Sequence, residues 1–269
     1  MTNDARVALI TGASAGLGRA CADRLAAAGW AVTGASRRGT AGPGWTGLVM
    51  DVDSDDAVQA SVAGVLESRG HIDALVAAAG WGVAGAAEDT SMEEAKAQFE
   101  TNFWGCVRVV QAVLPGMRAR RQGRIVLMSS IGGVIGIPFQ AYYSASKFAL
   151  EGFAESLAYE VAPFGISVTL VQPGNFATDF TGSRKMAAAA GRGDYAQAMA
   201  KAVAVMERDE RNGAPPGDVA AVVQRVLAAR RPPRRVSVGK TSERAGIIAK
   251  RLLPFRLFES AAKGSLGVE

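Results

Sequence analysis

Short apolar runs rich in β-branched residues alternate with longer helix-like stretches along most of the chain. Seven runs are predicted as strands: Val7–Thr11, Ala31–Ser36, Gly47–Asp51, Ala74–Ala79, Arg124–Ser129, Ser167–Gln172 and Arg235–Val238. Five stretches between them are predicted as helices: Leu17–Ala28, Asp55–Ser68, Met92–Ala119, Ser144–Ala162 and Val219–Ala229. This alternation is typical of βαβ units, so it predicts a parallel sheet flanked by helices.

Residues 174–217 interrupt the alternation with a long insertion rich in Ala and Gly. Its centre, around Tyr195–Glu210, has a helical pattern. Insertions of this length in a compact domain are usually functional or disordered. Because this one follows the carboxyl end of a strand, where open α/β sheets bind ligands, we expect a mobile lid over a substrate.

The tail, residues 240–269, carries large apolar side chains among basic residues. It could close the substrate cleft, meet a second subunit or rest on a membrane surface. Pro254 interrupts any long amphipathic helix, which favours the first two roles over membrane contact. We therefore expect one catalytic domain, residues 1–239, followed by a tail that covers the cleft or a subunit interface.

Three glycines, Gly12, Gly16 and Gly18, follow the first strand and open the first helix. Glycine allows a tight turn and a close approach to a pyrophosphate, while the helix N-terminus offers free N–H groups to the phosphates. The alternative is a plain βα turn, since the chain holds 32 glycines. With the alternating pattern, the turn predicts an α/β fold: a single-domain, Rossmann-type, doubly wound parallel sheet of about seven strands with a helical lid.

The second strand ends in Ser36-Arg37-Arg38, without a carboxylate in reach. An acidic residue here would bind the ribose hydroxyls of NAD, whereas arginine accommodates a 2′-phosphate. A guanidinium pairs with phosphate in bidentate fashion, so Arg37 favours NADP(H), and Arg38 could stack on adenine. A solvated pair of arginines in a loop is the alternative. Asp51 and Val52, which follow the third strand, are expected to meet the adenine.

Tyr143 and Lys147 stand four residues apart, an offset that a helix places on one face. The Lys147 ammonium can favour the phenolate of Tyr143, a group whose ordinary pKa is about 10. Ser130 lies thirteen residues before Tyr143. Together with the glycine turn, this cluster indicates hydride transfer assisted by proton transfer.

In this order, the motifs from about residue 5 to 238 resemble the short-chain dehydrogenase/reductase family, in particular its NADP-preferring, retinol/steroid dehydrogenase-like branch. The resemblance implies that Tyr143 exchanges a proton with the substrate oxygen and that Lys147 lowers the pKa of Tyr143 and binds the nicotinamide ribose. It also implies that Ser130 stabilises the developing alkoxide and that Asn102 holds a water. The implied cofactor-binding residues are Gly12, Ser14, Gly16, Leu17, Gly18, Ser36, Arg37, Arg38, Asp51, Val52, Ala78, Gly80, Tyr143, Lys147, Pro173, Gly174, Phe176 and Thr178.

Two positions depart from the family pattern. Ala77-Ala78-Ala79-Gly80 replaces the usual Asn-Asn-Ala-Gly, so hydrogen bonds that brace the sheet are expected to be lost. Ala15 stands where many NADP-dependent relatives carry a basic residue. Arg37 must then supply most of the affinity for the 2′-phosphate.

The expected activity is NADPH-dependent hydride transfer between the nicotinamide and a carbonyl or secondary alcohol. Apolar side chains near the site favour a bulky apolar ketone or aldehyde, although they could merely anchor the lid: Trp81, Val83, Ile137, Phe139, Phe176, Phe180 and Met186, together with Gln140. The alternatives are a non-catalytic NADP-binding regulator and a lyase or epimerase on the same scaffold. A regulator would be expected to lose Tyr143, Lys147 or Ser130, and an epimerase generally needs a larger C-terminal domain.

The composition limits the classes of molecule that the chain is expected to bind. The net charge of +5 comes partly from arginine clusters that lack interleaved aromatics, so no nucleic-acid partner is expected. Cys21 and Cys106 lack partner spacing, and no apolar run approaches the length of a membrane span, so a reduced, cytoplasmic protein is expected. No Cys, His and carboxylate cluster has ligand spacing, so no metal site is expected. A homodimer or homotetramer is expected through the helices at residues 92–119 and 144–162.

Overall fold

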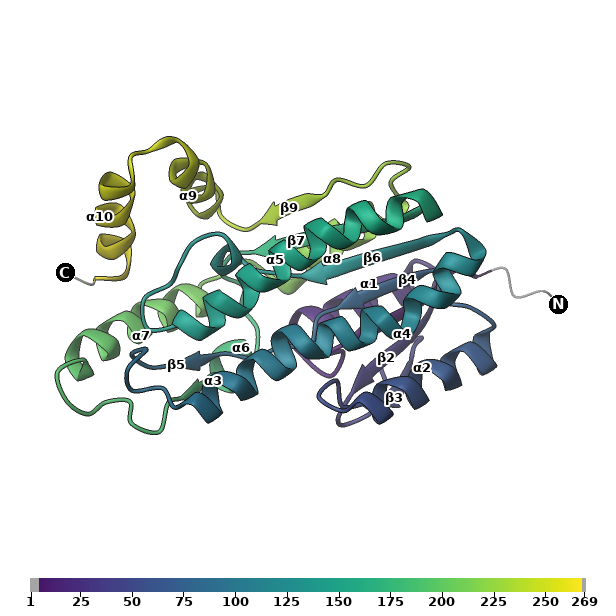
Figure 1. Cartoon of the computed structure of the whole chain (residues 1–269), viewed down its shortest axis with the longest axis horizontal. Helices are drawn as coiled ribbons and strands as arrows, with labels where there is room; N and C mark the ends of the chain where they lie inside the picture. Colours follow the sequence, from purple (N-terminus) through teal and green to yellow (C-terminus); the bar gives the residue numbers. More distant parts are fainter. Residues whose placement is uncertain (1–4, 268–269) are drawn as a thin grey trace.

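Seven parallel strands form the centre of the computed structural model, which describes residues 5–267 (Figure 1). The strand order is β3-β2-β1-β4-β6-β7-β9. The strands are β1 (Val7–Thr11), β2 (Ala31–Ser36), β3 (Thr46–Val49), β4 (Ala74–Ala77), β6 (Gly123–Met128), β7 (Ile166–Pro173) and β9 (Arg235–Val238). The predicted doubly wound parallel sheet is confirmed.

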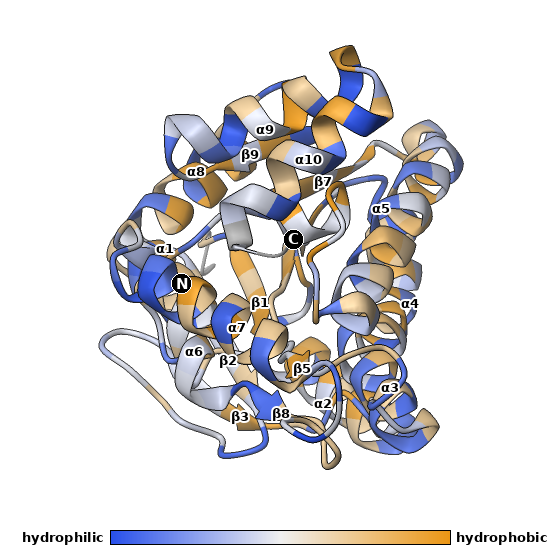
Figure 2. Cartoon of the chain, turned by 90° about the vertical axis from the view of Figure 1, so that its left-hand side faces the viewer, coloured by the Kyte–Doolittle hydropathy of each residue, from blue (hydrophilic) through white to orange (hydrophobic). Residues whose placement is uncertain are grey.

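Helices cover both faces of the sheet, with α1 and α8 on one side and α4 and α5 on the other (Figure 2). Each face has its own apolar core, because strands buried on both sides are apolar at almost every position. The main helices are α1 (Gly16–Ala27), α2 (Asp55–Arg69), α3 (Met92–Phe99), α4 (Gly105–Arg120), α5 (Ala141–Val161) and α8 (Pro216–Ala228).

The third helix differs from the single α-helix that the sequence predicts. A π-helical turn, η1 (Glu100–Trp104), separates α3 from α4. Such turns are rare and are found frequently at functional sites, because the extra residue in the turn displaces side chains from regular helical spacing. Here the turn contains Asn102, which is 1% exposed.

The carboxyl end of β4 also differs from the prediction, since the strand stops at Ala77 and not at Ala79. The backbone N–H groups of Ala78 and Ala79 both donate to Thr11 Oγ1, each at 3.1 Å. One threonine on β1 therefore satisfies the backbone of the segment in which alanine has replaced the usual asparagines. The expected loss of bracing is compensated here by Thr11.

The insertion, residues 174–217 and called the lid below after its expected role, contains α6 (Phe180–Ser183), β8 (Lys185–Met186) and α7 (Ala196–Arg211). The predicted helical centre of the lid is confirmed by α7. Strand β8 pairs with β5 (Val83–Ala84), so the lid is attached to the segment that follows β4.

The tail forms two helices, α9 (Thr241–Leu252) and α10 (Phe255–Leu266), separated at Pro254 as the sequence indicates. Glu243 on α9 accepts a hydrogen bond from the backbone N–H of Asn175, at the start of the lid, at 3.0 Å. The tail therefore contacts the point where β7 leads into the lid. Within residues 5–267, no helix has both the length and the apolar character needed to span a bilayer.

We predict that Thr11→Val lowers the free energy of unfolding by about 2 kcal/mol, because two partly buried N–H groups lose their acceptor. Urea denaturation measures this loss. Thr11→Ser keeps the hydroxyl and should retain most of the stability. Little or no loss of stability in Thr11→Val would show that the hydroxyl of Thr11 does not stabilise this edge.

Candidate active site

Tyr143 and Lys147 lie in the first two turns of α5 and are buried, with exposed fractions of 9% and 6%. The Lys147 ammonium lies 5.9 Å from the centroid of the Tyr143 ring and donates a hydrogen bond to the Met128 carbonyl at 2.9 Å. Because α5 begins at Ala141, earlier than predicted, both residues belong to one helix and share a face.

Burial raises the pKa of Tyr143, against a hydrogen bond from Ser130 that lowers it. The charges of Glu210 and Arg184 act on Tyr143 in opposite directions. The pKa of Tyr143 thus lies above its ordinary value, contrary to the expected lowering, because the loss of water around the phenol dominates. Burial also lowers the pKa of Lys147, to about 8.

Ser130 lies at the carboxyl end of β6, where it caps the short 3₁₀ helix η2 (Ile131–Gly133). Its Oγ accepts a hydrogen bond from the Gly132 N–H at 2.9 Å, which leaves the hydroxyl hydrogen free to donate. A Cβ at Gly132 would lie 3.1 Å from the Tyr143 ring and 3.3 Å from Ser130 Oγ. Ser130 and Tyr143 thus face the same small space.

Asn102 connects the loop after β4 to helix α5 through hydrogen bonds. Its Oδ1 accepts from the Trp81 N–H at 3.0 Å, and its Nδ2 donates to the Trp81 carbonyl at 3.0 Å and to Ser146 Oγ at 3.2 Å. A Cβ at Gly80 would lie 3.1 Å from Asn102 Oδ1 and 3.6 Å from Lys147 Nζ. Asn102, Gly80 and Lys147 are therefore neighbours.

The glycine turn is packed too tightly for other residues. Gly12 has a φ of +68°, and a Cβ there would lie 2.8 Å from the Ala78 carbonyl oxygen. A Cβ at Gly18 would lie 2.4 Å from the Gly12 carbonyl oxygen. Gly16 faces Thr178, the expected nicotinamide contact. A Cβ added at Gly16 would lie 3.5 Å from the Cβ of Thr178. The turn leaves the backbone open at the N-terminus of α1, as a pyrophosphate requires.

The carboxyl end of β2 lies beside this turn. Arg38 Nη2 donates to Ser14 Oγ at 2.9 Å, and Arg37 is close enough to Asp53 to lower the pKa of that carboxyl against the stronger effect of burial. Ser36 Oγ is buried without a hydrogen-bond partner within residues 5–267. An unpartnered hydroxyl beside two exposed arginines fits the ribose and phosphate of a dinucleotide.

The remaining expected cofactor residues are not equally close to this turn. Leu17 packs against the core on the α1 and α8 side of the sheet, and Val52 lies in the core on the α4 and α5 side. Asp51 accepts a hydrogen bond from the Asp53 N–H at 3.1 Å. Phe176 is buried on the α1 and α8 side of the sheet. Pro173 ends β7, whereas Gly174 faces the tail, because a Cβ there would lie 2.1 Å from Glu243 Oε2.

Sequence reasoning missed two acidic groups, the buried Glu151 and the partly buried Glu210. Glu151, one turn after Lys147, accepts from Ser129 Oγ at 2.7 Å, from Gln172 Nε2 at 2.8 Å and from Arg235 Nε at 2.9 Å. A carboxylate in an otherwise apolar helix face is the signal that could have identified it. Glu210 on α7 pairs with Arg184 in the lid, and no sequence spacing indicates that contact.

Comparisons with known proteins agree with this geometry. The family model described as short chain dehydrogenase matches residues 6–188. A 3-ketodihydrosphingosine reductase of Bacteroides thetaiotaomicron is 41% identical over 260 residues, covering 96% of this chain and 97% of its own. Human retinol dehydrogenase 8 is 47% identical over 133 residues, which cover 49% of this chain and 42% of its own.

Among solved structures, a short-chain dehydrogenase from Streptomyces avermitilis aligns with a TM-score of 0.85 and 32% identity. The alignment covers 98% of this chain and 100% of that one. Ordered motifs, sheet topology and near full-length relatives thus agree. The chain belongs to the short-chain dehydrogenase family.

Proposed function

We propose that the protein is an NADP(H)-dependent oxidoreductase that interconverts a bulky apolar ketone or aldehyde and its alcohol, with Tyr143 as the general acid and base. The observation that carries the proposal is the burial of Tyr143 and Lys147 beside the partly buried Ser130 at the carboxyl edge of the sheet. Buried titratable groups that converge in this way are typical of proton-transfer sites.

The nicotinamide, when bound, supplies or accepts the hydride. In the reductive direction Tyr143 donates its phenolic proton to the carbonyl oxygen as negative charge develops there. Ser130 donates its free hydroxyl hydrogen to the same oxygen and stabilises the alkoxide. The Lys147 ammonium stabilises the phenolate left on Tyr143, and Asn102 holds the neighbouring loop in place. A water held by Asn102 would connect Lys147 to solvent.

The preference for NADP(H) rests on Arg37 and Arg38. Both are exposed at the end of β2, where Arg37 would pair with the 2′-phosphate, and Arg38, held near the turn by Ser14, would stack on the adenine. A bidentate guanidinium–phosphate pair supplies both affinity and selectivity. Asp51 and Val52 would meet the adenine.

The substrate proposal follows from the lid. Phe180 packs beside Tyr143 with 5.8 Å between ring centroids, whereas Met186 is 46% exposed and turns away. The relative from Bacteroides thetaiotaomicron is named for reduction of a long-chain ketone. A long-chain ketone would satisfy an aromatic wall of this kind, and the tail would cover the cleft from the other side.

We also propose that the protein acts in the cytoplasm as a homodimer or homotetramer. Large apolar side chains are exposed on the proposed interface helices: Trp104 beside α4, and Phe148 and Tyr159 on α5. Burying such residues between copies would remove them from water.

Tyr143→Phe should lower kcat by at least about 100-fold, because the proton donor is lost while the ring remains. Affinity for NADPH, measured by fluorescence titration, should stay nearly unchanged. Turnover close to that of the wild type would refute the assigned role of Tyr143.

Arg37→Ala should weaken NADPH binding by about 1.5–3 kcal/mol and leave NADH binding nearly unchanged, because only NADPH carries the 2′-phosphate. Fluorescence titration with both cofactors measures the difference. Arg231→Ala, an exposed arginine remote from β2, is the matched control and should change neither. Equal losses for both cofactors would place the 2′-phosphate elsewhere.

The pKa of Lys147 is lowered to about 8, so between pH 8 and its ordinary value of 10.5 the unfolded chain binds more protons than the folded one. Stability should therefore rise with pH across this window. Lys147→Met lacks the effect and should be more stable than the wild type at pH 7. Its advantage, measured by urea denaturation, should shrink by about 3 kcal/mol toward pH 10.5. A difference in stability between the two proteins that does not change with pH would contradict the lowered pKa of Lys147.

A further inference from the structure

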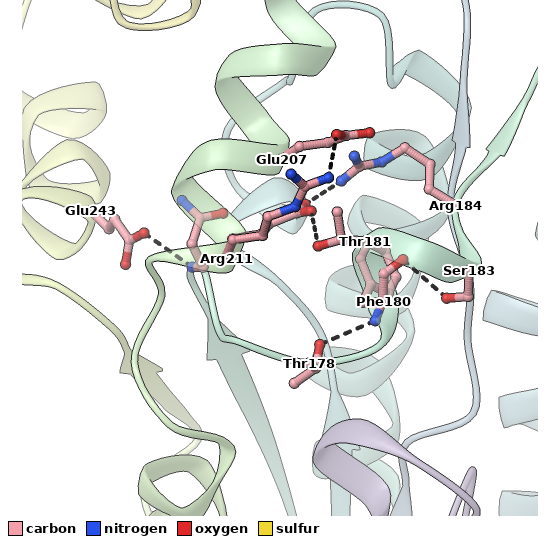
Figure 3. Close-up of polar contacts among 10 residues, drawn as sticks. Thr178, Phe180, Thr181, Ser183, Arg184, Glu207, Arg211 and Glu243 are labelled. Atoms are coloured by element: carbon pink, nitrogen blue, oxygen red, sulfur yellow. Dashed lines mark hydrogen bonds and ion pairs between the residues drawn. The ribbon is translucent and has the colours of Figure 1, made fainter.

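The lid buries an arginine that the proposed chemistry does not use. The Arg184 side chain is 2% exposed and pairs through Nη2 with Glu210, whose side chain is 12% exposed. Thr181 donates to the second oxygen of Glu210 at 2.6 Å. Figure 3 shows Arg184 extending from the lid toward α7, close to Phe180 and Thr181. The pair is thus fixed in place by the lid itself.

Arg184 keeps two unused donors. Its Nε and Nη1 atoms are buried and have no hydrogen-bond partner within residues 5–267. Leaving a buried charged donor unsatisfied costs more than the net gain of an ordinary hydrogen bond. A bound acceptor would relieve that cost.

Gln140 presents another unused donor in the same region. The residue is 3% exposed, and its Nε2 has no partner within the described part of the chain. A Cβ added at Gly82 would lie 3.9 Å from this Nε2 and 3.1 Å from Phe180 Cζ, so the amide and the ring are close together. The two side chains come from separate elements, the start of α5 and the lid.

Phe180 connects these donors to the reacting group. Its ring centroid lies 5.9 Å from the guanidinium carbon of Arg184 and 5.8 Å from the centroid of the Tyr143 ring. Gln140 also precedes Tyr143 by three residues on the chain. Three buried nitrogen donors without partners therefore lie near an aromatic side chain that packs beside Tyr143, and the charges of Arg184 and Glu210 both act on Tyr143.

The chemistry of the donors restricts the ligand. It must supply lone pairs, because every unused atom is a donor. Glu210 already neutralises Arg184, and an additional carboxylate or phosphate would face the negative charge of Glu210. A neutral oxygen avoids this repulsion. An alcohol hydroxyl accepts from a guanidinium and an amide without adding charge.

We propose that Arg184 and Gln140 bind a hydroxyl oxygen of the substrate, so that the preferred substrate is a ketone carrying a hydroxyl group close to the reacting carbonyl. The inference rests on the proposed reductase function and narrows its substrate class. A site built to hydrogen-bond a hydroxyl rejects the analogue without it, because its buried donors then remain unpaired. The apolar chain of the substrate would lie against the aromatic and aliphatic side of the lid.

The test compares 1-hydroxydodecan-3-one with dodecan-3-one, two ketones that differ only in the hydroxyl. The measured quantity is the ratio of their kcat/KM values with NADPH. The wild type should prefer the hydroxyketone by at least about tenfold, and Arg184→Met and Gln140→Met should each reduce this preference by about tenfold. Arg211→Met, an exposed lid arginine one residue from Glu210, is the matched control and should keep the wild-type ratio.

A second variant addresses lid stability, since Arg184→Met leaves the partly buried carboxylate of Glu210 without its cationic partner. Arg184→Met combined with Glu210→Gln removes both charges and should show the same loss of preference. A wild-type ratio near one, or a ratio unchanged in all three variants, would overturn the hydroxyl site while leaving the reductase function intact. No turnover of either ketone by the wild type would overturn the proposed function and the hydroxyl site together.

Discussion

The buried ammonium of Lys147 is the constraint on which the site depends. A charged group inside the sheet-facing side of α5 needs a partner, and the carboxyl end of β6 provides the Met128 carbonyl. This bond sets how far α5 can lie from β6. Since Tyr143 is one turn earlier on the same helix, its distance from Ser130 follows from the same contact.

A second polar network, centred on Glu151, also holds α5 against the sheet. Glu151 joins α5 to Ser129 on the strand β6 side, to Gln172 on β7 and to Arg235 on β9. Each carboxylate oxygen has a donor, so the buried charge is satisfied. The helix that carries Tyr143 is therefore tied to three neighbouring segments of the sheet edge, and its position is defined more sharply than apolar packing alone would achieve.

Much of this could be read from the sequence because local rules governed it. The glycine turn needs Gly12 and Gly18 for steric reasons that any βα turn over a phosphate imposes, and the i, i+4 spacing of Tyr143 and Lys147 needs only a helix. The π turn at Asn102, the bonds from Ala78 and Ala79 to Thr11 and the Arg184–Glu210 pair could not be read. Each joins residues whose proximity depends on tertiary packing. The predicted direction of the shift in the Tyr143 pKa was wrong for the same reason, because burial is a property of the folded chain.

The β5–β8 pairing that holds the lid is much shorter than the strand pairings of the central sheet. On this side the Lys185 N–H donates to the Gly82 carbonyl and the Ala187 N–H to the Ala84 carbonyl, both at 2.9 Å, and the strands are only two residues long. Separating them exchanges these bonds for bonds to water and leaves the seven-stranded sheet intact. Movement of the lid away from β5 therefore needs the separation of this two-residue ladder and of the Ala188–Glu94 hydrogen bond, and not of any strand in the seven-stranded sheet.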